Sequence, residues 1–237
     1  MSQRTLYTMT AAAGIATVVT TIIALAILLS AGPPAEGDSA QNVALFFADN
    51  RVPVLAGLYV GAISLAFNLA FYVLLRDVLR RADPESEALA TLGLIGGAVF
   101  IAVLYAGFAV LAQLAFREGT GDPTTQRTLY DVYTLTLTMT GAPTAVSLVA
   151  LSAVILRGKL LPAWIAWYGL AVAAIHLVSL GSFARDGLFT PTHRRRHDCP
   201  PRLRSVGVGD LCLALVKTVG GISFHGVSAR LSSDMGG

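Results

Sequence analysis

Long apolar runs alternate with short polar segments along most of the chain. A helix of about 20 mostly apolar residues crosses the hydrocarbon core of a bilayer. Lipid offers no partner for unpaired backbone groups, so a single open segment crosses it only as a helix. The pattern therefore predicts an all-α fold, a polytopic bundle of transmembrane helices within residues 1–191. Its five predicted spans occupy about residues 11–31, 53–75, 88–116, 131–156 and 160–183.

The fourth run contains a segment whose pattern conflicts with that prediction. Residues 133–140 alternate between apolar and polar side chains, a period of 2 that is typical of a strand. We expect a helix there, because a lone strand could not pair its backbone in lipid. Pro143 follows inside the same run and removes one backbone donor. It predicts a kink, with a gating hinge as the less favoured alternative.

The segments between the runs are polar and contain Gly and Pro, so they are predicted to be loops. Residues 32–52 include one apolar patch at 43–47, which predicts a loop with a single interfacial turn. Residues 76–87 form a charged linker, and residues 117–130 form a polar loop. The first run could instead be a secretory signal. It is longer than the roughly 7–15 apolar residues of such signals, so a retained span is preferred.

Small residues form a stripe along the second run and another along the third. They recur every three or four positions, which places each set on one helix face. Glycines let helix backbones approach closely, and close packing is preferred here over a ligand groove. A homo-oligomer or a membrane partner is the kind of protein contact that such stripes fit. The predicted packing positions are Gly57, Gly61, Gly93, Gly97 and Gly107.

Polar side chains inside the runs are the candidates for a binding site. His176 is the only ionisable side chain well inside one of the five runs, and such a residue is by default a functional candidate. We prefer the alternative that each polar side chain makes a helix-to-helix hydrogen bond worth about 0.6–2 kcal/mol. The candidate pocket residues are Asn68, Tyr72, Tyr105, Gln113 and His176.

Composition supports the membrane class and narrows the chemistry. The chain is 54% hydrophobic and 13% charged, against about 25% charged in an average globular domain. Its Cys and His residues near the C-terminal end match no zinc spacing. The sequence contains no phosphate-binding loop, nucleophile elbow or HExxH motif. It predicts no metal and no cofactor, and an enzyme is the least supported class.

The distribution of Lys and Arg predicts the orientation. With the amino terminus inside, the inner segments hold Arg4, Arg76, Arg80, Arg81, Arg157 and Lys159, and the outer ones hold Arg51, Arg117 and Arg127. Cytoplasmic loops collect basic residues. We therefore expect a multi-pass protein of a bacterial cytoplasmic (inner) membrane with a cytoplasmic amino terminus. The lipid bilayer is its expected partner, and nucleic acid is not indicated.

Residues 192–237 form a basic tail unlike the rest of the chain. They hold 7 Lys and Arg against 3 Asp and Glu, and both cysteines. A sixth span over residues 206–224 is disfavoured, because Asp210 and Lys217 would each cost about 2.5–3.5 kcal/mol near the bilayer centre. Two explanations of this tail stay open. One is that a shifted reading frame replaced a normal sixth helix, and the other is that the tail is a disordered segment that lies on anionic lipid.

The segment LLPAWIAWYGL at residues 160–170 follows a short basic turn. It resembles the LPxWLxWxG signature of small bacterial, especially actinobacterial, multi-spanning proteins of the DUF4386 kind. The order of elements over residues 10–190 is also similar to theirs. The resemblance implies a six-helix bundle with both ends in the cytoplasm and implies no activity.

Three function classes follow from these observations. A structural or regulatory membrane protein is preferred, because the intramembrane polar residues suit helix packing. The alternative is a small-molecule carrier with a polar pocket between helices two to five. The second alternative is an intramembrane enzyme.

Overall fold

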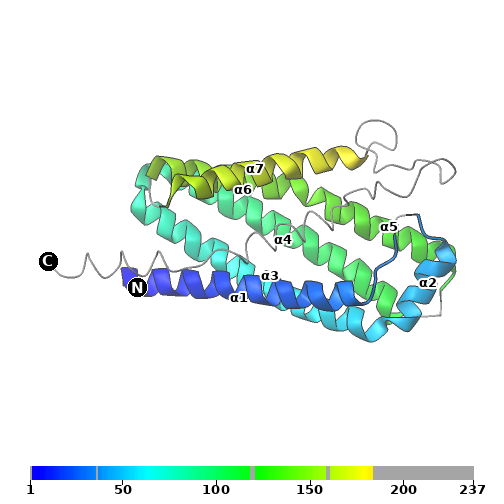
Figure 1. Cartoon of the computed structure of the whole chain (residues 1–237). Helices are drawn as coiled ribbons and strands as arrows, with labels where there is room; N and C mark the ends of the chain where they lie inside the picture. The colour runs from blue at the N-terminus through cyan, green and yellow to red at the C-terminus, as the bar shows by residue number, and fades with distance from the viewer. Residues whose placement is uncertain (1, 36, 118–120, 159–160, 184–237) are drawn as a thin grey trace, which may run out of the picture. The chain divides into compact units, whose positions relative to one another are not determined.

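The computed structural model describes residues 2–35, 37–117, 121–158 and 161–183 (Figure 1). Every regular element in these residues is a helix, which confirms the all-α prediction. The predicted tail and the disfavoured sixth span lie outside the described residues. The elements are α1 (Gln3–Ser30), α2 (Ala40–Asp49), α3 (Arg51–Ala82), η1 (Pro84–Ser86), α4 (Glu87–Phe116), α5 (Pro123–Met139), α6 (Gly141–Gly158), α7 (Ala163–Ser179) and η2 (Leu180–Phe183).

Four helical segments are long and apolar enough to cross a membrane. They are α1, α3, the segment Pro84–Phe116 and the segment Pro123–Gly158, which joins α5 and α6. α7 is also apolar but has only 17 residues. Apolar helices of these lengths are compatible with a lipid bilayer, whereas the predicted number of five spans is not confirmed.

α4 lies at the centre of the bundle, in contact with α3, α5 and α6. α1 packs along α3 on one flank, and α7 packs along α6 on the other (Figure 1). One end of the bundle holds α2, the end of α4 and the start of α5, and we call it the α2 end. The opposite end holds the start of α1, the α3–α4 turn, the end of α6 and the start of α7, and we call it the α3–α4 end.

The outer face of α1 is covered with exposed aliphatic side chains. A soluble helix would bury such a face, whereas a lipid-facing helix exposes it to hydrocarbon. This exposure agrees with the membrane class. The exposed residues in the middle of α1 include Ile15, Val18, Val19, Ile22 and Ile23.

α3 extends beyond the predicted end of the second run. It continues to Ala82, so most of the linker predicted at residues 76–87 is helical, which corrects the prediction. Arg, Leu and Ala in this part are good helix formers, and no proline interrupts them before Pro84. Leu79 is buried in one cluster with Ala90 of α4 and with Leu151 and Val154 of α6, so packing also holds this last part of α3 in place.

The single interfacial turn predicted within residues 32–52 is a ten-residue helix, α2, and the prediction was wrong. The Ser39 side chain caps this helix by accepting a hydrogen bond from the Asn42 backbone N–H at 3.2 Å. Val43 and Phe47 lie one turn apart and are fully buried. Because ten residues are too few for a helix to be stable by propensity alone, these tertiary contacts stabilise α2.

The polar segment predicted as a loop at residues 117–130 is helical from Pro123 onward, which is a third correction. The Asp122 carboxylate accepts a hydrogen bond from the Thr125 backbone N–H at 3.1 Å. An Asp cap followed by proline at the first helical position is a strong helix start. The segment was predicted as a loop because its composition is polar, although it contains this helix start.

The fourth run consists of two helices, because α5 ends at Met139 and α6 begins at Gly141. Pro143 lies in the first turn of α6 and has no N–H to offer the Met139 carbonyl. The alternating segment before the break is helical, as expected. Its threonines, Thr134, Thr136 and Thr138, donate to backbone carbonyls four residues earlier at 3.0, 2.7 and 3.1 Å, so their hydroxyls are satisfied within the helix.

Candidate functional site

The two glycines of α3 bring this helix close to two different neighbours. A Cβ atom added to Gly57 would lie 2.6 Å from Leu28 Cγ of α1. A Cβ atom added to Gly61 would lie 2.9 Å from the Phe108 ring of α4. Side chains therefore fill the space beside these glycines.

The glycines of α4 contact three helices. A Cβ atom added to Gly93 would lie 2.7 Å from Leu151 Cδ2 of α6. A Cβ atom added to Gly97 would lie 2.6 Å from the Tyr72 ring of α3. Gly107 is less crowded, since its nearest neighbour, a Thr136 methyl group of α5, would be 3.4 Å away. The α4 glycines thus meet α3 at Tyr72, and elsewhere they meet α5 and α6.

Gly96, beside the predicted stripe, makes the closest backbone approach in α4. A Cβ atom there would lie 2.9 Å from both the Pro143 carbonyl oxygen and the Ser147 backbone nitrogen. The Ser147 hydroxyl donates to the Gly93 carbonyl at 2.8 Å. Small residues thus allow α4 and α6 to touch through their backbones.

The predicted polar residues occupy separate places in the bundle. The Tyr72 ring packs at Gly97 of α4 and against the cluster that contains Leu151 of α6. The Tyr105 hydroxyl donates to the Ala62 carbonyl at 2.8 Å. Asn68 is partly buried, and Gln113 is exposed. The structure brings Tyr72 into a packed contact between α3, α4 and α6 but does not gather these residues around one cavity.

His176 lies on α7 with its side chain partly buried. Its backbone carbonyl accepts a hydrogen bond from the Ser179 hydroxyl at 2.7 Å. The same carbonyl would lie 2.8 Å from a Cβ atom on Gly141, the first residue of α6. The backbone at His176 therefore packs against the break between α5 and α6.

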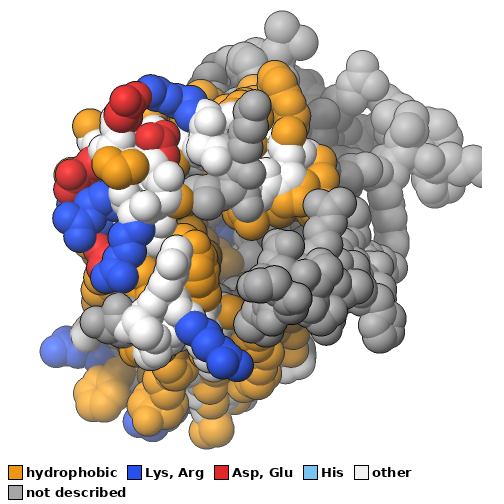
Figure 2. Space-filling view, turned by 90° about the vertical axis from the view of Figure 1, so that its left-hand side faces the viewer, with side chains coloured by type: hydrophobic (Ala, Val, Ile, Leu, Met, Phe, Trp, Pro, Cys, Tyr) orange, Lys and Arg blue, Asp and Glu red, His pale blue; other side chains and the backbone are white. Residues whose placement is uncertain are grey.

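A network of charged side chains covers the α3–α4 end, where Figure 2 shows arginines and acidic residues side by side. Arg76 of α3 pairs with Glu87 of α4 at 3.0 Å, and its Nε donates to the Thr91 hydroxyl at 3.2 Å. Arg80 lies 3.7 Å from Asp77 and 3.8 Å from Glu87. Exposed ion pairs contribute about 0–1 kcal/mol each, so this network marks a polar end more than it stabilises the fold.

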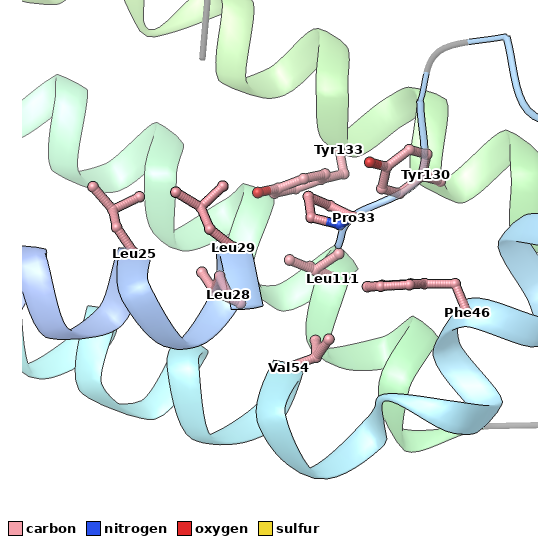
Figure 3. A pocket seen from close by; sticks show the side chains of 9 residues that line it. All are labelled: Leu25, Leu28, Leu29, Pro33, Phe46, Val54, Leu111, Tyr130 and Tyr133. Atoms are coloured by element: carbon pink, nitrogen blue, oxygen red, sulfur yellow. The ribbon is translucent and has the colours of Figure 1, made fainter. Parts of the chain in front are cut away.

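An apolar cavity of about 150 Å³ lies toward the α2 end (Figure 3). It is partly open and is formed by side chains from α1, α2, α3, α4, α5 and the connection after α1. The two polar atoms of its side chains are the hydroxyl oxygens of Tyr130 and Tyr133 (Figure 3). The lining residues are Leu25, Leu28, Leu29, Pro33, Phe46, Val54, Leu111, Tyr130 and Tyr133.

α2 and the connection before it are fixed to α5 beside this cavity. The Tyr130 hydroxyl donates to the Pro34 carbonyl at 2.9 Å. Arg127 donates to the Asp38 carbonyl at 2.7 Å and pairs with Asp131 at 3.0 Å. The ring of Phe47 packs edge-on against that of Tyr130, with centroids 6.0 Å apart. These contacts hold a wall of the cavity in place.

Comparison with known protein families shows to which family the chain belongs. A family model described as a domain of unknown function, DUF4386, matches residues 5–197 of the 237 residues. The chain belongs to the DUF4386 family. This membership confirms the resemblance drawn from residues 160–170. Comparisons with curated proteins and with solved structures find no match.

Both the cavity and the charged network of this DUF4386 protein lie within the matched residues. Within the described ranges, no group of three or more His, Cys, Asp or Glu side chains could hold a metal ion. Sequence reasoning missed the cavity, because its lining comes from segments far apart in the chain. The useful signal was the apolar patch at residues 43–47, with Val43 and Phe47 at helical spacing.

Proposed function

We propose that this DUF4386 protein is a structural or regulatory component of a bacterial cytoplasmic membrane. The observation that supports this most is the use of polar side chains between helices. Ser64 of α3 donates to the Thr17 carbonyl of α1 at 3.1 Å and shares a 2.6 Å hydrogen bond with the Thr21 hydroxyl. Tyr105 and Ser147 likewise bond to carbonyls of neighbouring helices. Side chains engaged in this way stabilise the bundle rather than bind a polar substrate.

In the proposed topology α7 is a fifth span and the α3–α4 end faces the cytoplasm. Seventeen residues are about the shortest helix that crosses the hydrocarbon core, and η2 extends α7 further. Arg4, Arg76, Arg80, Arg81 and Arg157 belong to the α3–α4 end, whereas Arg51, Arg117 and Arg127 belong to the α2 end. An excess of basic residues on the cytoplasmic side supports this orientation.

Asn68→Leu and His176→Leu test the proposed role. If both residues serve packing, each variant should complement a deletion strain as well as the unmodified protein does. Its apparent melting temperature should change by no more than about 8 °C, since even a complete intramembrane polar contact contributes only about 0.6–2 kcal/mol. The measurements are complementation, the amount of protein in the membrane, and thermal unfolding in detergent. Gln113→Leu, at an exposed position of α4, is the control.

A variant that is folded, present at the normal level and unable to complement would contradict the packing role. It would favour the second candidate, a small-molecule carrier. The junction between α5 and α6, where Pro143 has no N–H to offer the Met139 carbonyl, supports that candidate, because interrupted membrane helices form substrate sites in many transporters. Under the carrier hypothesis, His176→Ala abolishes uptake while leaving the bundle folded.

A further inference from the structure

The cavity toward the α2 end has the size and walls of a binding site for a small apolar group. Its volume is about 150 Å³, and seven of its nine lining residues have hydrocarbon side chains. In another protein, an engineered cavity of about 150 Å³ lined by similar side chains stays dry and binds benzene. The space therefore suits an apolar segment of about six to eight carbon atoms.

The two tyrosine hydroxyls of the cavity differ in their hydrogen bonding. Tyr130 donates its proton to the Pro34 carbonyl. Within the described residues the Tyr133 hydroxyl has no hydrogen-bond partner, and Figure 3 shows its oxygen pointing toward Leu29. The side chain is only partly buried and the cavity is partly open, so this hydroxyl is available to a ligand. A ligand oxygen that accepts from Tyr133 would add a directional hydrogen bond to the apolar contacts.

The cavity opens onto the apolar flank of the bundle. Leu25 and Leu29 line it and are also 39% and 55% exposed on the surface of α1. α1 packs along α3, and α5 packs along α4. α1 and α5 therefore flank the opening without packing closely on each other. A ligand would enter from the hydrocarbon region rather than from water, which favours an amphiphile over a polar solute.

We propose that this cavity binds an amphiphile, with about six to eight carbon atoms among the leucines and one oxygen accepting a hydrogen bond from Tyr133. Two kinds of molecule combine such an apolar chain with an oxygen acceptor. One is an acyl chain of a bilayer lipid with its ester carbonyl, and the other is a free medium-chain alcohol. The site goes beyond the structural or regulatory role and requires only that the bundle be embedded in a membrane.

Photolabelling of the full chain in lipid nanodiscs tests the site. The probes are a diazirine derivative of 1-octanol and a phosphatidylethanolamine with a diazirine in one acyl chain. Mass spectrometry should find saturable labelling of peptides that contain Leu111 or Tyr133. Leu29→Trp fills the opening and should reduce that labelling at least about fivefold. Tyr133→Phe should raise the half-saturating octanol concentration about two- to tenfold, the worth of one hydrogen bond.

Matched variants outside the cavity separate loss of labelling at the cavity from a general effect of a Trp or Phe substitution on labelling. Leu92→Trp on α4 and Tyr59→Phe on α3 replace exposed residues that do not line the cavity, and both should label like the unmodified protein. Labelling that unlabelled 1-octanol displaces identifies a free ligand. Lipid labelling at the same residues that octanol does not displace identifies a bilayer acyl chain.

Equal labelling of cavity peptides and lipid-facing peptides by both probes would overturn the proposal. So would cavity labelling that Leu29→Trp leaves unchanged in a folded variant. An unchanged half-saturating concentration in Tyr133→Phe would contradict the assigned hydrogen bond, and this near-isosteric change remains informative even if Leu29→Trp fails to fold. Because none of these variants alters Asn68 or His176, failure of the site is distinguishable from failure of the proposed role.

Discussion

Phe47→Ala should release α2 from the bundle while the membrane helices stay folded. Phe47 is fully buried at the α2 end and packs against Phe46 and Tyr130. Truncating a buried Phe costs about 3–5 kcal/mol. That loss should fall on α2, which contains only ten residues and depends on tertiary contacts. We expect amide exchange in α2 to become at least about 100-fold faster, as measured by hydrogen-exchange mass spectrometry in nanodiscs.

Leu45→Ala is the matched control, because Leu45 lies on the same helix and is 53% exposed. Its effect on α2 exchange should be small. If Phe47→Ala left α2 as protected as in the unmodified protein, the docking of α2 through Phe47 would be wrong. Simultaneous loss of protection in α2 and in the long helices would show that α2 is not a separate local unit.

Gly96→Ala should weaken the contact between α4 and α6. The added Cβ would lie 2.9 Å from two backbone atoms of α6, which cannot move aside as a flexible side chain can. The helices would have to separate, and the 2.8 Å bond from Ser147 to the Gly93 carbonyl would lengthen. Overpacking costs about 1–3 kcal/mol. The apparent melting temperature in detergent should therefore fall by about 2–12 °C.

Gly107→Ala is the control for this substitution. The nearest atom to its added Cβ is a Thr136 methyl group at 3.4 Å, an ordinary contact distance. Alanine favours a helix over glycine by about 0.8–1 kcal/mol, so Gly107→Ala should leave the melting temperature unchanged or raise it slightly. A larger loss of stability in Gly107→Ala than in Gly96→Ala would contradict the packing described for α4.

The long apolar helices were predictable, because a run of apolar residues long enough to cross a bilayer has few other stable structures in lipid. Helix ends were predicted less well. The last part of α3 carries Arg76, Arg80 and Arg81, so composition alone indicates a linker. The signal that composition lacks is the packing of Leu79 in one cluster with Leu151 and Val154 of α6, residues that are distant in the sequence.

The sites depend more strongly on contacts between distant segments. The glycine stripes were visible in the sequence, yet the closest backbone approach of α4 to α6 lies at Gly96, beside the predicted positions. The cavity brings Leu28 and Phe46 together with Tyr133, which α3 and α4 separate from them in the sequence. Helical periodicity shows which residues share one face, but it does not show which helix that face meets or how the two are rotated.

The most direct test of a membrane-spanning bundle is the accessibility of single cysteines at its two ends. In a chain carrying Cys199→Ser and Cys212→Ser, Glu85→Cys marks the α3–α4 end and Gln41→Cys marks the α2 end, both at exposed positions. A membrane-impermeant maleimide is added to intact spheroplasts and, separately, to lysed ones. The predicted topology gives labelling of Gln41→Cys in intact spheroplasts and of Glu85→Cys only after lysis. Labelling of both positions in intact spheroplasts would contradict a bundle that spans the membrane with its two ends on opposite sides.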